Sequence, residues 1–575
     1  MRMSKERYRA LYGPTTDDVI RLADTNLSVV VEADDVGYGD EPIWGYAKNI
    51  RAGMTQYDKV PSASELDVVV AGVVVVDPLL GIRKTNIGIK DGRIVAIGRA
   101  GSPSISDGVD LVIGPHTMPV MGYGLIATPG GVDSHVHLLT PRLIPVALSA
   151  GVTTLITGGF EEPPFAMLQT LRALEGWPVN IGLQACARTT NPEALVALLE
   201  AGAVGFKIHE DYGATPEIID GTLAIADVHD VTVCLHTDGL NESCELEDTV
   251  RAIAGRAIHA YHVEGAGGGH IPNLMEIVAE SNVICSSTTP TLPYGTAAAR
   301  EHQDMILLSH NGSAQSEDDL AAALERIHPA TMAAEGPLHE LGAISIINSD
   351  SQGMGRIGET VRRTWQLAHV MKTWRAQREG IGWHEPAAVA RSGPSATAGI
   401  ISLDNDNERV LRYLSKYTIN PAITHGVAAD VGTLATGRLA DIVLWKPTYF
   451  GVRPELILKG GYPAWGALGE GNASVERSEP VQYGSHWGGM APNSLATTFV
   501  SRAALDTGIA AALGSRRTLR TPHGSRGVTR RSMVGNDYAP SITVDPVNGS
   551  VTLDGRLLTA TPVDEVPLNR RYFLA

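Results

Sequence analysis

Residues 192–209 read PEALVALLEAGAVGFKIH, a helix-like apolar pattern that runs directly into a short apolar strand ending in polar residues. The alternation recurs, with strand patterns in GVTTLIT (151–157), VTVCLHT (231–237) and AISIINS (343–349) and another helix pattern in EDTVRAIAGRA (247–257). Strands that alternate with helices predict parallel βα units. A span of roughly 290 residues suits a (β/α)8 TIM-type barrel, whose site lies at the carboxyl ends of the strands.

β structure is expected on both sides of this barrel. Residues 67–98 contain DVVVAGVVVVD and TNIGIKDGRIVAIG, in which Lys-Asp-Gly marks a hairpin, and GRLADIVLW follows at 437–445. We therefore predict an α/β fold in which the barrel is flanked by a β-sandwich domain built from N- and C-terminal segments. The expected divisions are a β-rich N-terminal domain, the barrel, the return strands of the β domain and a separate, looser C-terminal region, at residues 1–130, 131–425, 426–480 and 481–575.

Composition excludes several classes of protein. The 575 residues exceed one compact domain, and 43% apolar residues with 19% charged ones predict a large globular core. A net charge of −17 argues against nucleic-acid binding, so the six arginines between 516 and 531 are interpreted as a solvated loop. We expect no secretory signal and no membrane span. The four cysteines lack paired spacing, which predicts reduced structural thiols and a cytoplasmic protein.

Two His-containing pairs carry the strongest chemical signal. His135 and His137 follow the Gly-rich approach IATPGGVDS, and residues two apart on a strand face the same side, as a metal ion requires. Lys207 and His209 repeat this spacing at the end of AVGFKIH. An ammonium offers no lone pair, but a desolvated neutral lysine can react with carbon dioxide to form a carbamate whose two oxygens bridge two metals. A salt-bridged core lysine is the alternative.

Further candidate ligands close other predicted strands. His236 follows VTVCL, His262 lies in AIHAYHVEG, and Asp350 ends ISIINSD. His259 is interpreted as structural. Together with the two pairs, these residues form a nitrogen-and-oxygen set large enough for two divalent ions, and it contains no thiolate. Two metals about 3.5–4 Å apart polarise a carbonyl and supply hydroxide at neutral pH, which is amide hydrolysis chemistry.

Long motifs resemble one family almost from end to end. They are YRALYGPTTDDVIRLADTNL, KIHEDYGATP, LHTDGLNES, EGAGGGH, SDSQGMGR, KYTINPAITHG, GRLADIVLW and RRYFLA. The chain thereby resembles the urease alpha (catalytic) subunit, within the amidohydrolase superfamily. The resemblance implies two nickel ions per subunit, whereas the ligand spacing alone equally allows zinc.

The resemblance also implies a role for each site residue. His135, His137 and Asp350 would bind one nickel, His236 and His262 the other, and N6-carboxylated Lys207 would bridge both. His209 would donate a hydrogen bond to the urea oxygen. His310 would give a proton to the departing ammonia, with Asp211 and Arg326 as its polar partners. Backbone carbonyls at Gly267 and Gly353 would accept the urea amino hydrogens.

The chain also departs from the family pattern. Ser309-His310-Asn311 replaces Cys-His-His, and Gly353 stands at an Ala-type position. The segment GGFEEPPFAML (158–168) replaces a longer loop, and its Glu161 and Glu162 either favour a cationic substrate or are solvated. The tail from Trp487 to Arg531 is altered as well.

The expected function is hydrolysis of urea to ammonia and carbamate, which then yields carbon dioxide. The alternatives are hydrolysis of another urea or guanidine derivative by the same dinuclear centre, and a catalytically silent urease paralogue. The resemblance further implies separate urease beta and gamma subunits in a trimer of heterotrimers, and accessory proteins that load nickel.

Overall fold

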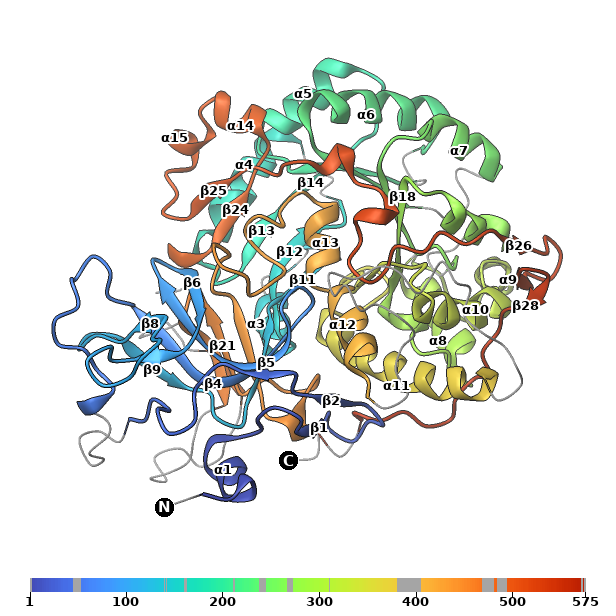
Figure 1. Ribbon diagram of the computed structural model, residues 1–575. Coiled ribbons are helices and arrows are strands. Elements are labelled where there is room, and N and C mark those ends of the chain that lie inside the picture. Colours follow the sequence, from blue (N-terminus) through green and yellow to red (C-terminus); the bar gives the residue numbers. More distant parts are fainter. Residues whose placement is uncertain are drawn as a thin grey trace.

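The computed structural model describes residues 3–44, 53–138, 140, 142–159, 163–209, 213–236, 245–265, 272–309, 311–379, 405–467, 480–482, 494–569 and 572. Figure 1 shows a central α/β region with an N-terminal β region on one side of it. Helix α1 (Lys5–Tyr12) precedes strands β1 (Val19–Arg21) and β2 (Ser28–Val30), which pair with each other below the central region in Figure 1. Strand β3 (Ala33–Asp34) joins the N-terminal β region.

Parallel strands form the central region. They are β11 (Gly131–Val136), β12 (Val152–Thr157), β13 (Asn180–Gly182), β14 (Gln184–Cys186), β15 (Gly205–Ile208), β16 (Thr232–His236), β17 (Ile258–Tyr261), β18 (Val283–Thr288) and β19 (Ile346–Asn348). The order is β11-β12-β13 in one sheet and β14 to β19 in the other. A parallel bridge between Val136 and Ser351 then brings the end of β19 beside β11. The first and last strands of the series are therefore neighbours.

Helices alternate with these strands, as the sequence predicts. They are α3 (Leu143–Ser149), α4 (Pro164–Ala173), α5 (Pro192–Glu200), α6 (Pro216–His229), α7 (Leu246–Ile253), α8 (Ala298–Ser309), α9 (Glu317–Glu325), α10 (Pro329–Glu340), α11 (Thr360–Glu379), α12 (Asn407–Ser415) and α13 (Ile419–Thr424). Helix α5 begins where the Asn191 side chain caps the amide of Glu193, with Pro192 in the first turn, and it buries Leu195 and Leu199. Local capping and apolar spacing together therefore explain this helix.

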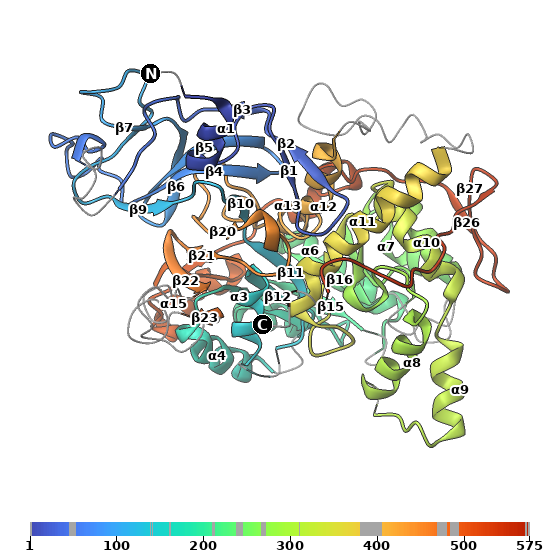
Figure 2. The same cartoon turned by 90° about the horizontal axis from the view of Figure 1, so that it is seen from below.

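Segments from both ends of the chain share one mixed sheet. It contains β4 (Val68–Asp77), β5 (Gly81–Lys90), β6 (Arg93–Gly98), β9 (Met118–Met121) and β10 (Ile126–Pro129), followed by β20 (Ile442–Trp445), β21 (Leu456–Lys459), β22 (Tyr462–Ala467) and β23 (Pro480–Gln482). Strand β10 pairs in parallel with β4 and antiparallel with β20, which joins the two segments. Figure 2 shows the blue and orange strands side by side. The expected hairpin at 90–92 joins β5 to β6, with Asp91 and Gly92 at positive φ.

Residues 494–569 of the predicted C-terminal region include strands that pair with the central region. Strand β24 (Thr497–Phe499) pairs in parallel with β13 and with β25 (Thr518–Arg520), and helices α14 (Arg502–Asp506) and α15 (Ile509–Leu513) lie between them. Later strands β26 (Ile542–Val544), β27 (Val551–Leu553) and β28 (Arg556–Leu557) form a small antiparallel sheet. The tail therefore extends the sheet of β11, β12 and β13. Its strand β24 pairs with backbone groups that would otherwise be unpaired at the edge of β13.

The interpretation of the arginine cluster as a solvated loop is only partly correct. Arg516 and Arg531 are exposed, but Arg517 and Arg530 are buried. The Arg517 guanidinium donates to the carbonyl oxygens of Val179 (2.6 Å) and Thr497 (3.0 Å). Backbone carbonyls satisfy these donors, and this arrangement has no signature in the local sequence.

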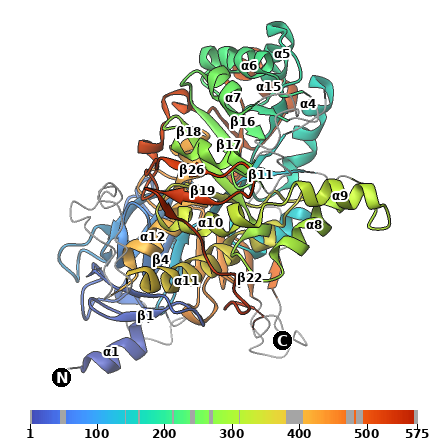
Figure 3. The same cartoon turned by 90° about the vertical axis from the view of Figure 1, so that its right-hand side faces the viewer.

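Helices α8 and α9 project from the body of the molecule in Figures 2 and 3. Among the helices that the structure describes, none combines the length and apolar character needed to cross a membrane.

Candidate metal centre

The six predicted ligands lie at the carboxyl ends of five parallel strands. His135 belongs to β11, Lys207 to β15 and His236 to β16, and all three are buried. The other three, His137, His262 and Asp350, follow the ends of β11, β17 and β19. His262 and Asp350 are also buried, whereas the His137 side chain is 27% exposed. The parallel order of the strands therefore gathers residues from positions 135 to 350 at one end of the central region.

Asp350 joins the two histidines of the first pair. Its Oδ1 lies 3.2 Å from Nε2 of His135 and 3.2 Å from Nε2 of His137. The second pair is equally close, since Nε2 of His262 lies 3.0 Å from Nδ1 of His236. The two sets are adjacent, because the ring centroids of His135 and His262 are 4.9 Å apart. Ligand atoms of His135, His262 and Asp350 all lie within 4.8 Å of one another.

Lys207 extends toward an aromatic ring beside these histidines. Its Nζ lies 3.9 Å from the ring centroid of Tyr261, which stacks on His135 at 3.9 Å. The Tyr261 hydroxyl donates to the carbonyl of Ser134 at 2.7 Å. Tyr261 thus holds the His135 ring from one side and contacts Lys207 on the other. Tyr261 was not among the predicted site residues, although its place in β17 one residue before His262 was a possible signal.

Asp133 holds the two ligand-bearing loops together and was also missed. Its carboxylate accepts hydrogen bonds from the backbone amides of His135 (3.2 Å) and Ser349 (3.1 Å) and from the hydroxyl of Thr360 (3.2 Å). Burial raises the pKa of Asp133 to about 6, although the donors at Ser349 and His135 lower it. The carboxylate therefore links the end of β11 to the loop after β19.

The backbone at two ligands adopts an unusual conformation. His262 and Asp350 have φ values of 44° and 50°, in the left-handed region that non-glycine residues seldom occupy. Such strain persists only where the surrounding structure holds it, and it concentrates at functional sites. At His262 and Asp350 the left-handed conformation occurs where the chain turns away after β17 and β19.

Glycines provide the space for the ligands. A Cβ atom at Gly158 would lie 2.1 Å from Cδ2 of His135, and one at Gly353 would lie 2.4 Å from Oδ1 of Asp350. A Cβ at Gly159 would lie 3.0 Å from the Cys186 sulfur and 3.1 Å from Cγ of Lys207. Any side chain at 158 or 353 must therefore displace a candidate ligand.

Electrostatics set the protonation states that metal binding requires. Burial lowers the pKa of His135 well below its ordinary value, so the imidazole is neutral at pH 7. For Asp350, burial raises the pKa, but the nearby His135 and His137 outweigh that effect and bring it well below its usual range. Neutral imidazoles and an ionised carboxylate are the forms that bind metals.

Comparison with known proteins identifies the family. The model of the amidohydrolase family matches residues 126–463, more than half of the chain. The chain belongs to the amidohydrolase family. It is therefore a hydrolase that acts on carbon–nitrogen bonds. The first 120 residues also match the model of the urease alpha-subunit N-terminal domain, which makes this amidohydrolase urease-like.

Solved structures similar to this amidohydrolase include a D-hydantoinase (dihydropyrimidinase) from Thermus sp., at 15% identity and a TM-score of 0.48, covering 69% of this chain and 95% of that one. A dihydropyrimidinase from Brevibacillus agri matches at 15% identity and 0.47, covering 69% and 94%. A putative prolidase from Bifidobacterium longum matches at 17% and 0.46, covering 75% and 98%. The family assignment rests on the sequence match.

The residues of this amidohydrolase fit the metal ions typical of its family. The donor set contains imidazole nitrogen and carboxylate oxygen, which suit borderline divalent ions. Ligand atoms of His135, His262 and Asp350 lie within 4.8 Å of one another, and all three side chains are buried. Such a convergence of buried donors fits a bound divalent ion.

The remaining site residues predicted for the amidohydrolase are only partly described. His209 follows β15, and its ring stacks on His236 at 4.0 Å. Burial, followed by the nearby His236 and Lys207, lowers the pKa of His209, so this imidazole is neutral. Arg326 directly follows α9. His310, Asp211 and Gly267 lie outside the described residues, as do Glu161 and Glu162 of the shortened loop.

Proposed function

We propose that this amidohydrolase is a urease catalytic subunit, which uses two nickel ions to hydrolyse urea to ammonia and carbamate. The observation that carries the proposal is the meeting of His135, His137 and Asp350 beside the pair formed by His236 and His262. The match of residues 1–120 to the urease alpha N-terminal domain supports urea as substrate.

In this proposal the central region is a (β/α)8 barrel spanning residues 131–425, and its β-sandwich partner combines residues 1–130 and 426–480. The parallel order of β11 to β19 and the Val136–Ser351 bridge support the barrel. Residues 481–575 form the C-terminal region. The proposed assembly includes separate beta and gamma subunits in a trimer of heterotrimers, with accessory proteins for nickel loading, in the cytoplasm.

The proposed ligands divide into two sets. His135, His137 and Asp350 would hold the first ion, His236 and His262 would hold the second, and Lys207, carboxylated at N6, would supply oxygen ligands to both. When bound, the two ions supply Lewis-acid activation of the urea carbonyl and a nucleophile derived from water.

Other residues bind urea and move protons. His209 is neutral, so one ring nitrogen carries a proton that can be donated to the urea oxygen. Carbonyl oxygens at Gly267 and Gly353 accept hydrogen bonds from the urea amino groups. His310 protonates the departing nitrogen, and Asp211 and Arg326 orient its ring.

The test is production of the full chain with urease accessory proteins in nickel-supplemented medium, followed by measurement of metal content and ammonia release. We expect two nickel ions per chain and faster ammonia release from urea than from guanidine. Two metals with faster turnover of guanidine would favour the guanidine alternative, for which Glu161 and Glu162 provide the sequence argument. Two metals without turnover of either compound would favour the silent paralogue.

A paired substitution tests the metal assignment. The double variant His135→Ala/His137→Ala removes both histidine partners of Asp350 and is expected to lose nickel and at least about 100-fold in turnover. Unchanged turnover in this variant would overturn the assignment.

A further inference from the structure

A second cluster of metal-binding side chains lies inside the central region. It consists of Cys234 on β16, His259 on β17 and His425, which directly follows α13. Cys234 and His259 are partners in the strand register. All three side chains are buried, and none belongs to the proposed nickel ligands. The cluster therefore brings a thiol and two imidazoles together away from water.

The spacing of the donor atoms matches a tetrahedral ion. Nδ1 of His259 lies 3.2 Å from Nε2 of His425 and 3.8 Å from Sγ of Cys234, and ligand atoms of all three residues lie within 4.8 Å of one another. Zinc bonds of roughly 2.0–2.1 Å to nitrogen and 2.3 Å to sulfur, at tetrahedral angles, separate two nitrogens by about 3.3 Å and sulfur from nitrogen by about 3.6 Å. The observed distances differ from these values by only a few tenths of an ångström.

The two facing imidazole nitrogens cannot both present unshared lone pairs to each other. Either one nitrogen carries a proton toward the other, or both lone pairs bind the same cation. Nε2 of His259 is buried and has no hydrogen-bond partner among the described residues. If that nitrogen carries the proton, the lone pair of His259 is on Nδ1, the atom that faces the other two residues of the cluster.

Gln184 completes the surroundings of the cluster. Its amide nitrogen lies 3.2 Å from Sγ of Cys234 and 3.3 Å from Nδ1 of His425. In this orientation the Gln184 nitrogen can donate to a thiolate at Cys234, and the amide oxygen lies 3.4 Å from the Tyr261 hydroxyl. Gln184 thus links the cluster to Tyr261.

We propose that Cys234, His259 and His425 bind one zinc ion, distinct from the dinuclear centre. Thiolate sulfur and imidazole nitrogen are both ligands that zinc accepts, and three of them leave one tetrahedral position for a further ligand. The ion joins β16 and β17 to the segment after α13. Through Gln184 it also supports Tyr261, the residue stacked on His135. This zinc site is structural and independent of the identity of the substrate.

X-ray absorption at the zinc edge on the purified full chain tests the proposal. We expect one sulfur neighbour at about 2.3 Å from zinc, at a stoichiometry of one such zinc per chain. The proposed nickel ligands include no sulfur, so the signal reports this site whether or not the enzyme hydrolyses urea. Zinc bound only by nitrogen and oxygen, or no bound zinc, would overturn the proposal and leave a hydrogen-bonded cluster.

A matched pair of substitutions assigns the sulfur. Cys234→Ser keeps a hydrogen-bonding group beside Gln184 but removes the thiolate, and it should lose the zinc–sulfur signal and one zinc per chain. Cys285→Ser changes another buried thiol, on β18 two strands away from β16, and should retain both. Equal zinc and sulfur signals in the two variants would contradict the assignment. If Cys234→Ser does not fold, the spectrum of the unsubstituted chain decides.

Discussion

The imidazole of His135 lies against a position that has no side chain. Gly158 follows β12, and its missing Cβ leaves room for the edge of the His135 ring, while Tyr261 stacks on the ring face. The orientation of this candidate ligand therefore depends on one glycine and one aromatic residue.

Gly158→Ala tests this dependence. The added methyl group would lie 2.1 Å from Cδ2 and 2.8 Å from Nε2 of His135, so the ring must move away from Asp350. We expect metal affinity to fall roughly 10- to 100-fold, as it does when groups that orient a ligand are altered. Equilibrium dialysis followed by metal analysis measures the change. Gly176→Ala is the control, because nothing lies within 4 Å of its added Cβ; equal affinity in both variants would contradict the argument.

Buried neutral histidines also link stability to pH. Burial, followed by the charge of Lys416, lowers the pKa of His339 well below its usual range. The side chain lies on α10, with Nε2 at 2.9 Å from the Ser287 hydroxyl. In the unfolded chain the same imidazole binds a proton near pH 6.5. Stability is therefore lost as the pH falls below that value, because only the unfolded state takes up this proton.

His339→Gln removes an imidazole that takes up a proton when the chain unfolds. Between about pH 6 and 5, the free energy of unfolding of the metal-free chain should fall less steeply in the variant, by roughly 1.4 kcal/mol per pH unit. Chemical denaturation at several pH values measures this slope. The exposed His523→Gln should leave the slope close to that of the parent chain. A slope in the His339 variant equal to that of the parent would exclude His339 as a source of acid lability.

Hydrogen bonds from single arginine side chains anchor the C-terminal tail to the central strands. Arg530 is completely buried and donates to the carbonyl of Val283 at 2.7 Å, to Sγ of Cys285 at 3.0 Å and to the carbonyl of Ala343. These partners belong to β18 and to the segment before β19. Arg530 therefore anchors the tail to β18 and to the segment that leads into β19, the strand before Asp350.

Arg530→Ala should be strongly destabilising. The substitution leaves buried carbonyl oxygens without donors and opens a cavity, which together cost about 3 kcal/mol or more. Thermal unfolding should show a midpoint several degrees lower. Arg531→Ala, one residue away on the exposed side, should change the midpoint little. Similar midpoints for the two variants would indicate that Arg530 does not anchor the tail.

Element patterns in the sequence predicted much of this architecture. The helix and strand patterns at 192–209 correspond to α5 and β15, and EDTVRAIAGRA contains α7. They succeeded because capping, apolar spacing and turn residues are local properties. The interpretation of the arginine cluster as a solvated loop failed for Arg517 and Arg530. Their burial depends on carbonyl groups hundreds of residues earlier in the chain.

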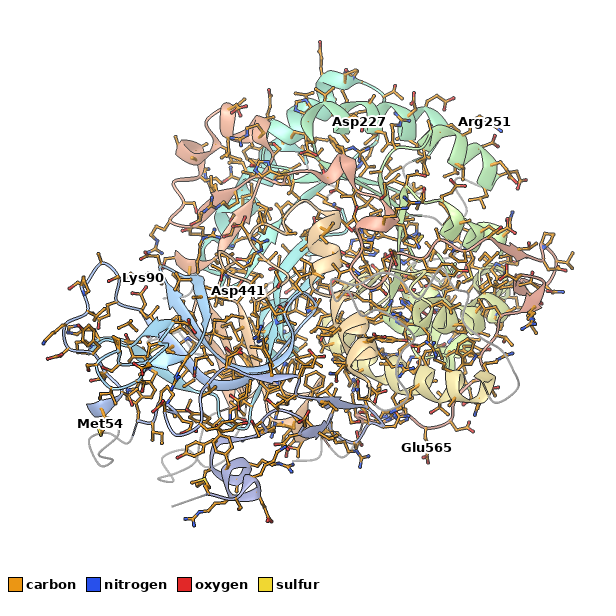
Figure 4. All side chains as sticks on the ribbon, in the orientation of Figure 1. Met54, Lys90, Asp227, Arg251, Asp441 and Glu565 are labelled. Carbon is orange, nitrogen blue, oxygen red and sulfur yellow. The ribbon has the colours of Figure 1, made fainter. Side chains whose placement is uncertain are left out.

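In the whole molecule, a buried ion pair joins the mixed sheet, which contains segments from both ends of the chain, to the central strands. Lys459 on β21 lies 2.8 Å from Asp441, whose other oxygen accepts from the Asn180 side chain on β13 at 2.7 Å. Burial lowers the pKa of Lys459, and the charge of Asp441 opposes that shift. Figure 4 labels Asp441 where the N-terminal β region meets the central strands.

Asp441→Asn tests whether this pair holds the two regions together. It leaves the Lys459 ammonium buried without its counter-charge, which typically costs about 3–5 kcal/mol. The double variant Asp441→Asn/Lys459→Met removes the stranded charge as well and should recover a substantial part of that loss. Denaturant unfolding of both variants measures the difference. A double variant less stable than the single one would show that the ammonium is not the source of the penalty.

The types of the candidate ligands and their places at strand ends could be predicted along the chain. His135 and His137, with Lys207 and Asp350, were identifiable because a period of two and a position after an apolar run are readable along the chain. The side chains that surround these four residues depend on the tertiary fold. Asp133, Gly158 and Tyr261, and the cluster of Cys234, His259 and His425, become neighbours through strand order and register, which bring together side chains that no local pattern connects.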